Sequence, residues 1–338
     1  MKYMLASIDQ NCSMFAGYIN QGVIMSGLFK YVTGLDVNLS SSSDQAVVYA
    51  NGRNQVAINI NFVVTDQYYN QIMLTDEQIK QCVFVGDYNL GTVLFPGQSS
   101  DGWVASLEKG DFVTTAGLNT SLKVGDSYAT ELKDAHGNIY QGITYYMSCS
   151  EYNAYSRTFC GFITPDNLNT YVTSAHGTSF DDGVVLTPLP EISYDYTQVT
   201  FLHTEEASSD YGQHHVEQVD YYVSLPEVSI KKGEVDSSSD RLYYIQHYSS
   251  TEDRYQCCFD VGEEATWTLT LPDGTQIPIE YNKRAGQQNI VCLKVTNSAS
   301  LYTSNEYCNS MIYDAFGNRG HLRFVPEASG SEVGMYNA

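Results

Sequence analysis

The stretch ANGRNQVAININFVVTD, residues 50–66, decides the fold. From residue 56 onward every second residue is apolar and the residues between them are mostly polar; the apolar set is Val56, Ile58, Ile60, Phe62 and Val64. Because successive side chains of a strand point to opposite faces, this pattern predicts a half-buried antiparallel β-strand. The Asn51-Gly52 pair predicts a turn before the strand, and Asp66 marks the end of the strand.

The same alternation recurs along the chain. In TWTLTLPDGTQIPIEY, residues 266–281, it occurs on both sides of Asp273-Gly274 and predicts a β-hairpin. Only TDEQIKQC, residues 75–82, carries a helix signal, the capping-box spacing of Thr75 and Gln78. We therefore expect an all-β protein of tandem immunoglobulin-like antiparallel β-sandwich domains. A chain of 338 residues is too long for one such domain of roughly 100 residues.

Breaks in the pattern predict three regions. Residues 1–36 form an apolar, Gly-rich N-terminal segment, residues 37–188 a β-sandwich region, and residues 189–338 a β-sandwich domain. The polar run at residues 40–43 marks the first break. The sequence LTPLP, residues 186–190, marks the second, because prolines disfavour a central strand. The middle region is long for one sandwich, so a division near residue 125 is an alternative.

A family resemblance rests on VVYANGRNQVAININFVVTDQYYN, residues 47–70. Its Ala-Asn-Gly turn leads into an alternating strand that ends in an Asp-x-x-x-Asn turn, and DAFGN, residues 314–318, repeats that turn. The stretch resembles the bacterial immunoglobulin-like repeats of invasin and intimin-type surface proteins, in which the fourth turn residue is Gly; here it is Tyr69. The resemblance implies a sandwich fold and a spacer, adhesive or particle-building role, and it carries no catalytic residues.

Charge and tyrosine content bear on partners. Asp and Glu number 39 against 17 Lys and Arg, so the net charge of −22 argues against nucleic acid and anionic membranes as partners. The 28 tyrosines are explained mainly by strand packing, and a surplus hints at a protein-binding or glycan-binding face. By strand phase, Tyr146 and Tyr222 are the outward tyrosines and the candidate binding residues.

The eight cysteines include no Cys-x-x-Cys pair, so no zinc site is expected, and buried reduced thiols are the default. A hairpin turning near Asn153 would place Cys149 opposite Cys160, which makes these two the disulfide candidates. Cys257 and Cys258 lie next to each other on a predicted strand and should face opposite sides. No cofactor is expected; calcium, bound by turn aspartates such as Asp181 and Asp182, is the alternative.

The N-terminal region has no signal-peptide pattern, because its first apolar run is too short. We expect residues 14–35 to form packed strands. The alternative is that this segment inserts into a membrane or a partner. No hydrolase or phosphate-loop motif is present, so an enzyme is not expected. We expect a structural or adhesive protein of a bacterium or phage, which self-associates or binds other surfaces. It would be secreted or particle-associated after a stay in the bacterial cytoplasm. The alternative is a secreted virulence factor or toxin component that uses the N-terminal segment.

Overall fold

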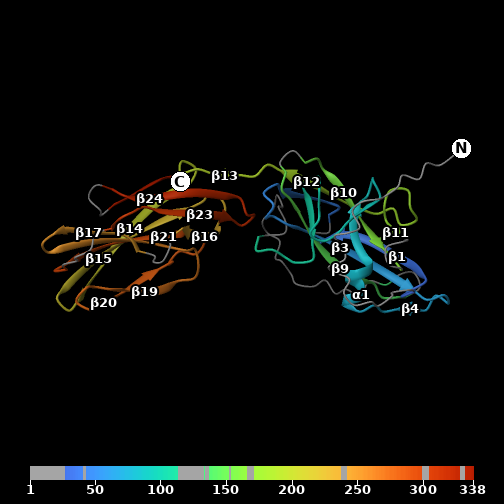
Figure 1. The fold of residues 1–338 in the computed structure, drawn as a ribbon, viewed down its shortest axis with the longest axis horizontal. Coiled ribbons are helices and arrows are strands. Elements are labelled where there is room, and N and C mark those ends of the chain that lie inside the picture. Colours follow the sequence, from blue (N-terminus) through green and yellow to red (C-terminus); the bar gives the residue numbers. More distant parts are fainter. Residues whose placement is uncertain are drawn as a thin grey trace, which may run out of the picture.

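The computed structural model describes residues 27–40, 43–112, 133, 137–151, 154–165, 171–236, 242–298, 304–327 and 332–338. These residues form strands almost throughout and build two β-sandwiches that lie end to end (Figure 1). The all-β sandwich fold class predicted from the sequence is confirmed. Most neighbouring strands are antiparallel; the two exceptions among the described strands each join an early strand to a late one.

The N-terminal sandwich has two sheets around one core. The first sheet contains β1 (Tyr31–Leu39), β3 (Val56–Thr65), β4 (Gln71–Ile72), β7 (Ser99–Ser100), β8 (Trp103–Ser106) and β9 (Gln141–Cys149). The second contains β2 (Gln45–Tyr49), β5 (Val83–Asp87), β6 (Thr92–Leu94), β10 (Arg157–Ile163), β11 (Val172–Thr173) and β12 (Val184–Leu189). All five alternating apolar residues of β3 face the shared core.

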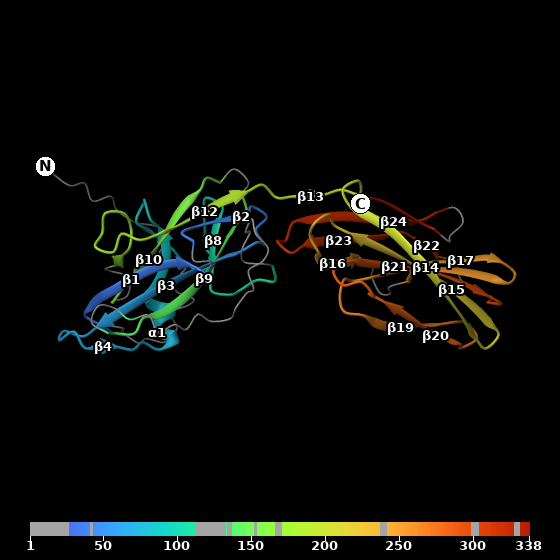
Figure 2. The ribbon, with the colours of Figure 1, turned by 180° about the vertical axis from the view of Figure 1, so that it is seen from behind.

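The C-terminal sandwich also has two sheets, and a separate hairpin covers one of them (Figure 2). One sheet contains β13 (Ser193–Tyr194), β16 (Ile230–Asp236), β23 (Cys308–Asp314), β24 (Arg319–Pro326) and β25 (Val333–Asn337). The other contains β14 (Thr200–Tyr211), β15 (His214–Ser224), β17 (Leu242–Ser249), β18 (Glu252–Phe259), β21 (Gln288–Thr296) and β22 (Ser304–Asn305). The hairpin is β19 (Ala265–Thr270) with β20 (Gln276–Tyr281), as predicted.

The central strands of the second of these sheets are buried on both faces. Cys258 belongs to the core shared with the first sheet, whereas Cys257 belongs to the core shared with the β19–β20 hairpin. The prediction that adjacent cysteines face opposite sides is therefore confirmed. At its central strands this three-layer arrangement leaves no polar outer surface, whereas most described side chains of β14 are exposed.

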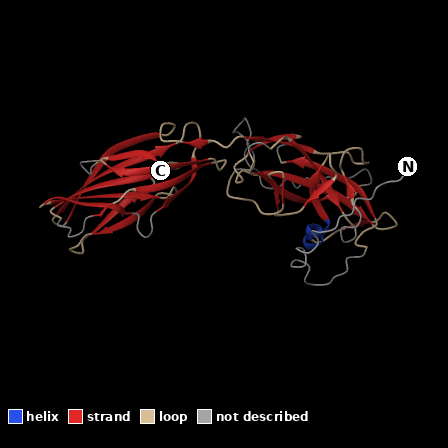
Figure 3. Ribbon diagram, turned by 45° about the horizontal axis from the view of Figure 1, so that its top comes forward, coloured by secondary structure: helices blue, strands red, loops and turns tan. Residues whose placement is uncertain are grey.

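Helix α1 (Asp76–Cys82) is the one helix in the described residues, and it lies beside the N-terminal sandwich (Figure 3). The Thr75 hydroxyl accepts from the backbone N–H of Gln78, and the Gln78 side chain accepts from the backbone N–H of Thr75. The two ends of the capping box satisfy each other, so the short helix begins where the sequence predicted.

The structure corrects the first predicted break and the alternative division near residue 125. Strand β1 runs through residue 37 and pairs with β3, so residues 31–36 belong to the sandwich and not to a separate segment. Residue 125 lies outside the described residues, but β3 pairs with β9 and β5 pairs with β10 across it. One sandwich therefore spans this region, because each of its sheets needs strands from both sides of residue 125.

The sequence LTPLP lies at the division between the two sandwiches, but most of it belongs to a strand. Its first four residues end strand β12, where Pro188 lies opposite Val48 of β2 in a parallel pair. Proline is tolerated there because β10 pairs only with residues 184–186 of β12, so the last part of β12 has a neighbour on one side.

Candidate functional site

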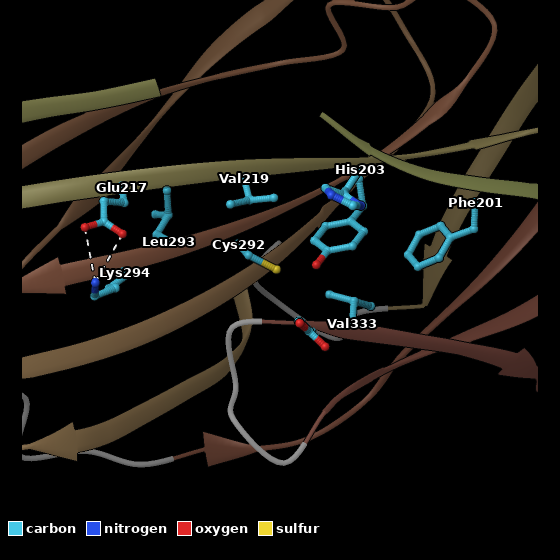
Figure 4. Close-up of a pocket in the computed structure, with 10 residues that line it drawn as sticks. Phe201, His203, Glu217, Val219, Cys292, Leu293, Lys294 and Val333 are labelled. Atoms are coloured by element: carbon cyan, nitrogen blue, oxygen red, sulfur yellow. Dashed lines mark hydrogen bonds and ion pairs between the residues drawn. The ribbon is translucent and has the colours of Figure 1, made fainter. Parts of the chain in front are cut away.

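A groove opens on one side of the C-terminal sandwich, and we call it the lateral groove. It has a volume of about 480 Å³, and its walls come from β14, β15, β21 and the start of β25 (Figure 4). The residues that line it are Phe201, His203, Glu217, Val219, Tyr221, Cys292, Leu293, Lys294, Glu332 and Val333.

Unequal strand lengths explain the groove. Strands β14 and β15 are 12 and 11 residues long, whereas β24 and β25 of the facing sheet are 8 and 5 residues long. Because alternate side chains share a face, Glu217 and Val219 extend the row that includes buried Tyr221. The core-facing row of β15 thus continues into the groove, where the facing sheet covers it only partly.

The two ends of the groove differ in character, as Figure 4 shows. At one end Phe201 stacks on Tyr221, with ring centroids 5.2 Å apart and planes at 24°, and His203 lies 5.9 Å from the same ring. At the other end the Lys294 ammonium contacts both Glu217 carboxylate oxygens, at 3.1 and 3.2 Å. The groove therefore offers an aromatic surface next to a charge pair.

Two ionisable groups of the groove, Tyr221 and Cys292, have raised pKa values. Burial raises the pKa of Tyr221 to about 12, and the nearby Cys292 and Glu332 add to the rise. Burial also raises the pKa of the Cys292 thiol well above its ordinary value. A thiol without thiolate character is a poor nucleophile, so the floor of the groove is suited to contact and not to covalent catalysis.

No three His, Cys, Asp or Glu side chains in the described part of the chain come together as a metal-binding group. The aspartates considered for calcium make protein contacts: Asp182 accepts from the Val37 backbone N–H at 2.7 Å, and Asp181 accepts from the Tyr88 hydroxyl. The hydrogen bond from Tyr88 lowers the pKa of Asp181.

The two tyrosines predicted as binding residues do not come together. Tyr146 lies on β9 of the N-terminal sandwich and is partly exposed. Tyr222 is 3% exposed on β15, and the Arg284 guanidinium lies 4.5 Å from its ring centroid. The prediction of an outward Tyr222 is wrong because the central strands of its sheet are covered on both faces. Its neighbour Tyr221, on the opposite face of the strand, is the tyrosine that reaches the groove.

The predicted Cys149–Cys160 disulfide is also wrong; both thiols are free and buried. Strands β9 and β10 lie in different sheets instead of forming a hairpin. Cys149 faces the core between the sheets, whereas Cys160 belongs to a small cluster with Phe84 and Phe162 on the other face of its sheet. The predicted turn residue Asn153 lies outside the described residues.

The two sequence motifs behind the family resemblance meet where the sandwiches touch. The Asn51 side-chain amide donates to the Phe316 carbonyl at 3.1 Å and to Asn318 Oδ1 at 3.2 Å. Arg53 Nε donates to the Gly317 carbonyl at 2.7 Å, and its guanidinium pairs with Glu191. The loop at residues 50–54 and the turn at residues 314–318 thus form a polar junction between the two domains.

Structure comparison finds solved structures that are similar to this chain. The C-terminal domain of the AgI/II polypeptide BspA of Streptococcus agalactiae is 11% identical, with a TM-score of 0.23; the match covers 90% of this chain and all of the other. No family model matches the chain, and no curated protein matches it.

Proposed function

We propose that this chain is a non-enzymatic structural or adhesive protein of a bacterium or phage, and that the lateral groove is its contact surface. The observation that carries the proposal is the position of the groove between two sheet edges. Among the described strands, β14 pairs only with β15, and β25 pairs only with β24. A free edge presents unpaired backbone groups to an incoming strand.

An extended protein segment is the occupant that this geometry favours. Such a segment can hydrogen-bond to the edge of β14 and place an apolar side chain against Phe201, Tyr221 and Val333. The Glu217–Lys294 pair at the other end would then fix the direction of the segment by charge. Binding of a protein segment, from a second copy or from another surface protein, is therefore the proposed activity.

The domain junction supports a structural role. Hydrogen bonds and an ion pair connect the two sandwiches in addition to the covalent link. A spacer transmits position only if its domains hold a fixed relation, and such a junction limits hinge motion. This agrees with the spacer or adhesive role that the invasin-type resemblance implies. Secretion or incorporation into a particle is the localisation that we propose with it.

The toxin alternative relies on residues 14–35 being free to engage a membrane. Of these, residues 14–26 lie outside the described part. Leu35 is buried in the N-terminal core, and β1 is paired along its length with β3. In the described residues, no helix has the length and apolar character to cross a membrane. No observation favours this alternative over the structural function.

Light scattering over a wide range of protein concentrations tests the proposal. We expect the native chain to self-associate and Phe201→Ser to weaken that association, because Phe201 lines the groove. Leu202→Ser is the matched control: Leu202 lies next along the same strand, is 53% exposed and does not line the groove. A native chain that stays monomeric at every concentration contradicts self-assembly. Equal association of both variants contradicts the role of the groove.

A further inference from the structure

Two turns of the chain, DQYYN at residues 66–70 and DAFGN at residues 314–318, have the same hydrogen-bond network. In each, the backbone N–H of the aspartate donates to the carbonyl of the asparagine, at 2.9 Å in both. The aspartate Oδ1 accepts from the third and fifth backbone N–H groups, at 2.7 and 2.9 Å in the first turn and at 2.8 and 2.9 Å in the second. The asparagine amide donates to aspartate Oδ2, at 3.0 and 2.9 Å respectively.

The fourth residue of both turns has a positive φ, +64° at Tyr69 and +79° at Gly317. Glycine adopts this conformation freely, whereas tyrosine adopts it at a conformational cost. The first turn therefore has the complete network although it lacks the glycine. Its tyrosine is not required by the turn, which works with glycine elsewhere in the same molecule.

The second turn shows what this network can be used for. Its third and fourth carbonyls accept hydrogen bonds from Asn51 and Arg53 of the other sandwich. Phe316 lies against Tyr49, with ring centroids 5.6 Å apart. A Cβ on Gly317 would come within 2.9 Å of Arg53 Cβ. The turn at residues 314–318 is thus a docking turn, and close docking leaves no room for a side chain at its fourth position.

The first turn lies beside β4, at the end of the N-terminal sandwich remote from the C-terminal sandwich (Figures 1 and 2). There Tyr68 is 74% exposed and Tyr69 is 65% exposed. The Tyr69 ring stacks on Tyr31, with centroids 4.9 Å apart and planes at 10°. Met73, also exposed, extends this surface, which we call the aromatic tip: Tyr31, Tyr68, Tyr69 and Met73. Residues of this kind are enriched in protein interfaces.

We propose that the aromatic tip is a docking site for a loop of another protein that carries an asparagine and an arginine. The carbonyls of Tyr68 and Tyr69 occupy the turn positions at which Phe316 and Gly317 accept from the Asn51-Gly52-Arg53 loop. The partner's loop donates to these two carbonyls but lies farther from the turn than residues 51–53 lie from Gly317, because the Tyr69 side chain excludes that closer packing. Its arginine lies over the stacked rings of Tyr31 and Tyr69. The turn at residues 314–318 has no such surface, because glycine stands at the position of Tyr69.

Contacts between arginine and tyrosine elsewhere in this molecule support an arginine in the partner's loop. Two other exposed tyrosines carry a guanidinium over the ring: Arg254 lies 3.7 Å from the ring centroid of Tyr248, and Arg323 lies 4.1 Å from that of Tyr307. Such cation–π contacts strengthen as the surface is desolvated. The net charge of −22 also attracts a basic loop. The chain's own loop at residues 50–54 is occupied by its own docking turn, so the partner is a different protein.

The test uses a cyclised peptide with the sequence of residues 49–55, YANGRNQ, immobilised at high density, and measures binding of the full-length chain by biolayer interferometry. We expect the native chain to bind, and Tyr69→Gly to reduce binding at least about tenfold, because about 1.4 kcal/mol of contact is lost. A peptide with alanine at the arginine position should bind less. Tyr155→Ala, which changes a tyrosine that is 89% exposed and outside the tip, is the matched control and should bind like the native chain.

A thermal melt of each variant separates loss of the site from loss of the fold. Tyr69→Gly should melt within a few degrees of the native chain, because relief of the positive φ offsets the lost stacking. Absence of binding by the native chain overturns the proposal. Undiminished binding by Tyr69→Gly also overturns it, since the peptide is then bound elsewhere. The groove variant Phe201→Ser should bind the peptide normally, so failure of the groove proposal leaves this one intact.

Discussion

Replacement of Asn51 by alanine is the perturbation with the most clearly traceable effect. The side chain is 9% exposed and makes four hydrogen bonds. Within its own loop, Oδ1 accepts from the backbone N–H groups of Arg53 and Asn54, at 2.9 and 2.8 Å. Across the junction, the amide donates to the Phe316 carbonyl and to Asn318 Oδ1. One side chain therefore fixes the loop and joins it to the other domain.

The expected loss follows from these four bonds. At about 1 kcal/mol net for each hydrogen bond, Asn51→Ala should lower the free energy of unfolding by about 4 kcal/mol. About half of this belongs to the loop and half to the junction. Asn51→Asp is the matched variant, because it keeps the Oδ1 acceptor and replaces the amide donor by an oxygen that faces two other oxygens. Asn51→Asp should retain the two hydrogen bonds within the loop and lose the two hydrogen bonds across the junction.

Urea unfolding measures both parts, because each sandwich contains one of the chain's two tryptophans, Trp103 and Trp267. A Trp→Phe change in either domain leaves a fluorescence signal from the other domain alone. In the alanine variant the Trp103 transition should move to lower urea, and the two transitions should separate as the coupling is lost. A change below about 1 kcal/mol in the Trp103 transition would refute the view that Asn51 organises the junction.

Three further predictions are independent of it. Gly317→Ala should destabilise the chain more than Gly52→Ala in urea unfolding: both glycines have positive φ, but a Cβ meets Arg53 at 2.9 Å at Gly317 and only Ser150, at 3.5 Å, at Gly52. His214 hydrogen-bonds Asp273 at 2.7 Å and lowers the pKa of that carboxylate from 3.8 to about 2. Because the folded pKa is depressed, the stabilisation is present above about pH 4 and is lost as the pH falls toward 2; Asp273→Asn should be less stable than the native chain at neutral pH by circular dichroism and equal to it below pH 2. The seven described cysteines are buried and unpaired, so a thiol reagent should label them only on unfolding, and a protected disulfide found by mass spectrometry would contradict this.

The parts of the fold that the sequence predicted depend on neighbouring residues. The alternation in β3, the Asp273-Gly274 turn and the capping box of Thr75 and Gln78 each act over a few residues, and each is confirmed. The wrong predictions depend on which strands become neighbours. Cys149 and Cys160 were expected in one hairpin, but pairing over long sequence separations places β9 and β10 in different sheets.

The candidate site could not be predicted from the sequence, for a related reason. Strand phase correctly separates Tyr221 from Tyr222, but it cannot show that a hairpin almost fifty residues further along covers the face of Tyr222. Nor can it show that β14 and β15 extend past the facing sheet, which is the origin of the lateral groove. Exposure of a strand residue is set by the layer opposite it, and that layer is distant in the sequence.

The repeated Asp-x-x-x-Asn turn is the sequence signal whose meaning changes most once the structure is known. As a pattern it indicates the end of a strand, and the tyrosine at its fourth position looks like a defect. In the structure the side chains of Asp66 and Asp314 each connect the residues of a five-residue turn, and the third and fourth carbonyls of the second turn accept from Asn51 and Arg53. Acceptors held in place by such a network bind a partner loop at little entropic cost. The residue at the fourth position then sets how the turn is used: Gly317 permits close packing inside the molecule, whereas Tyr69 presents an aromatic surface at its free end.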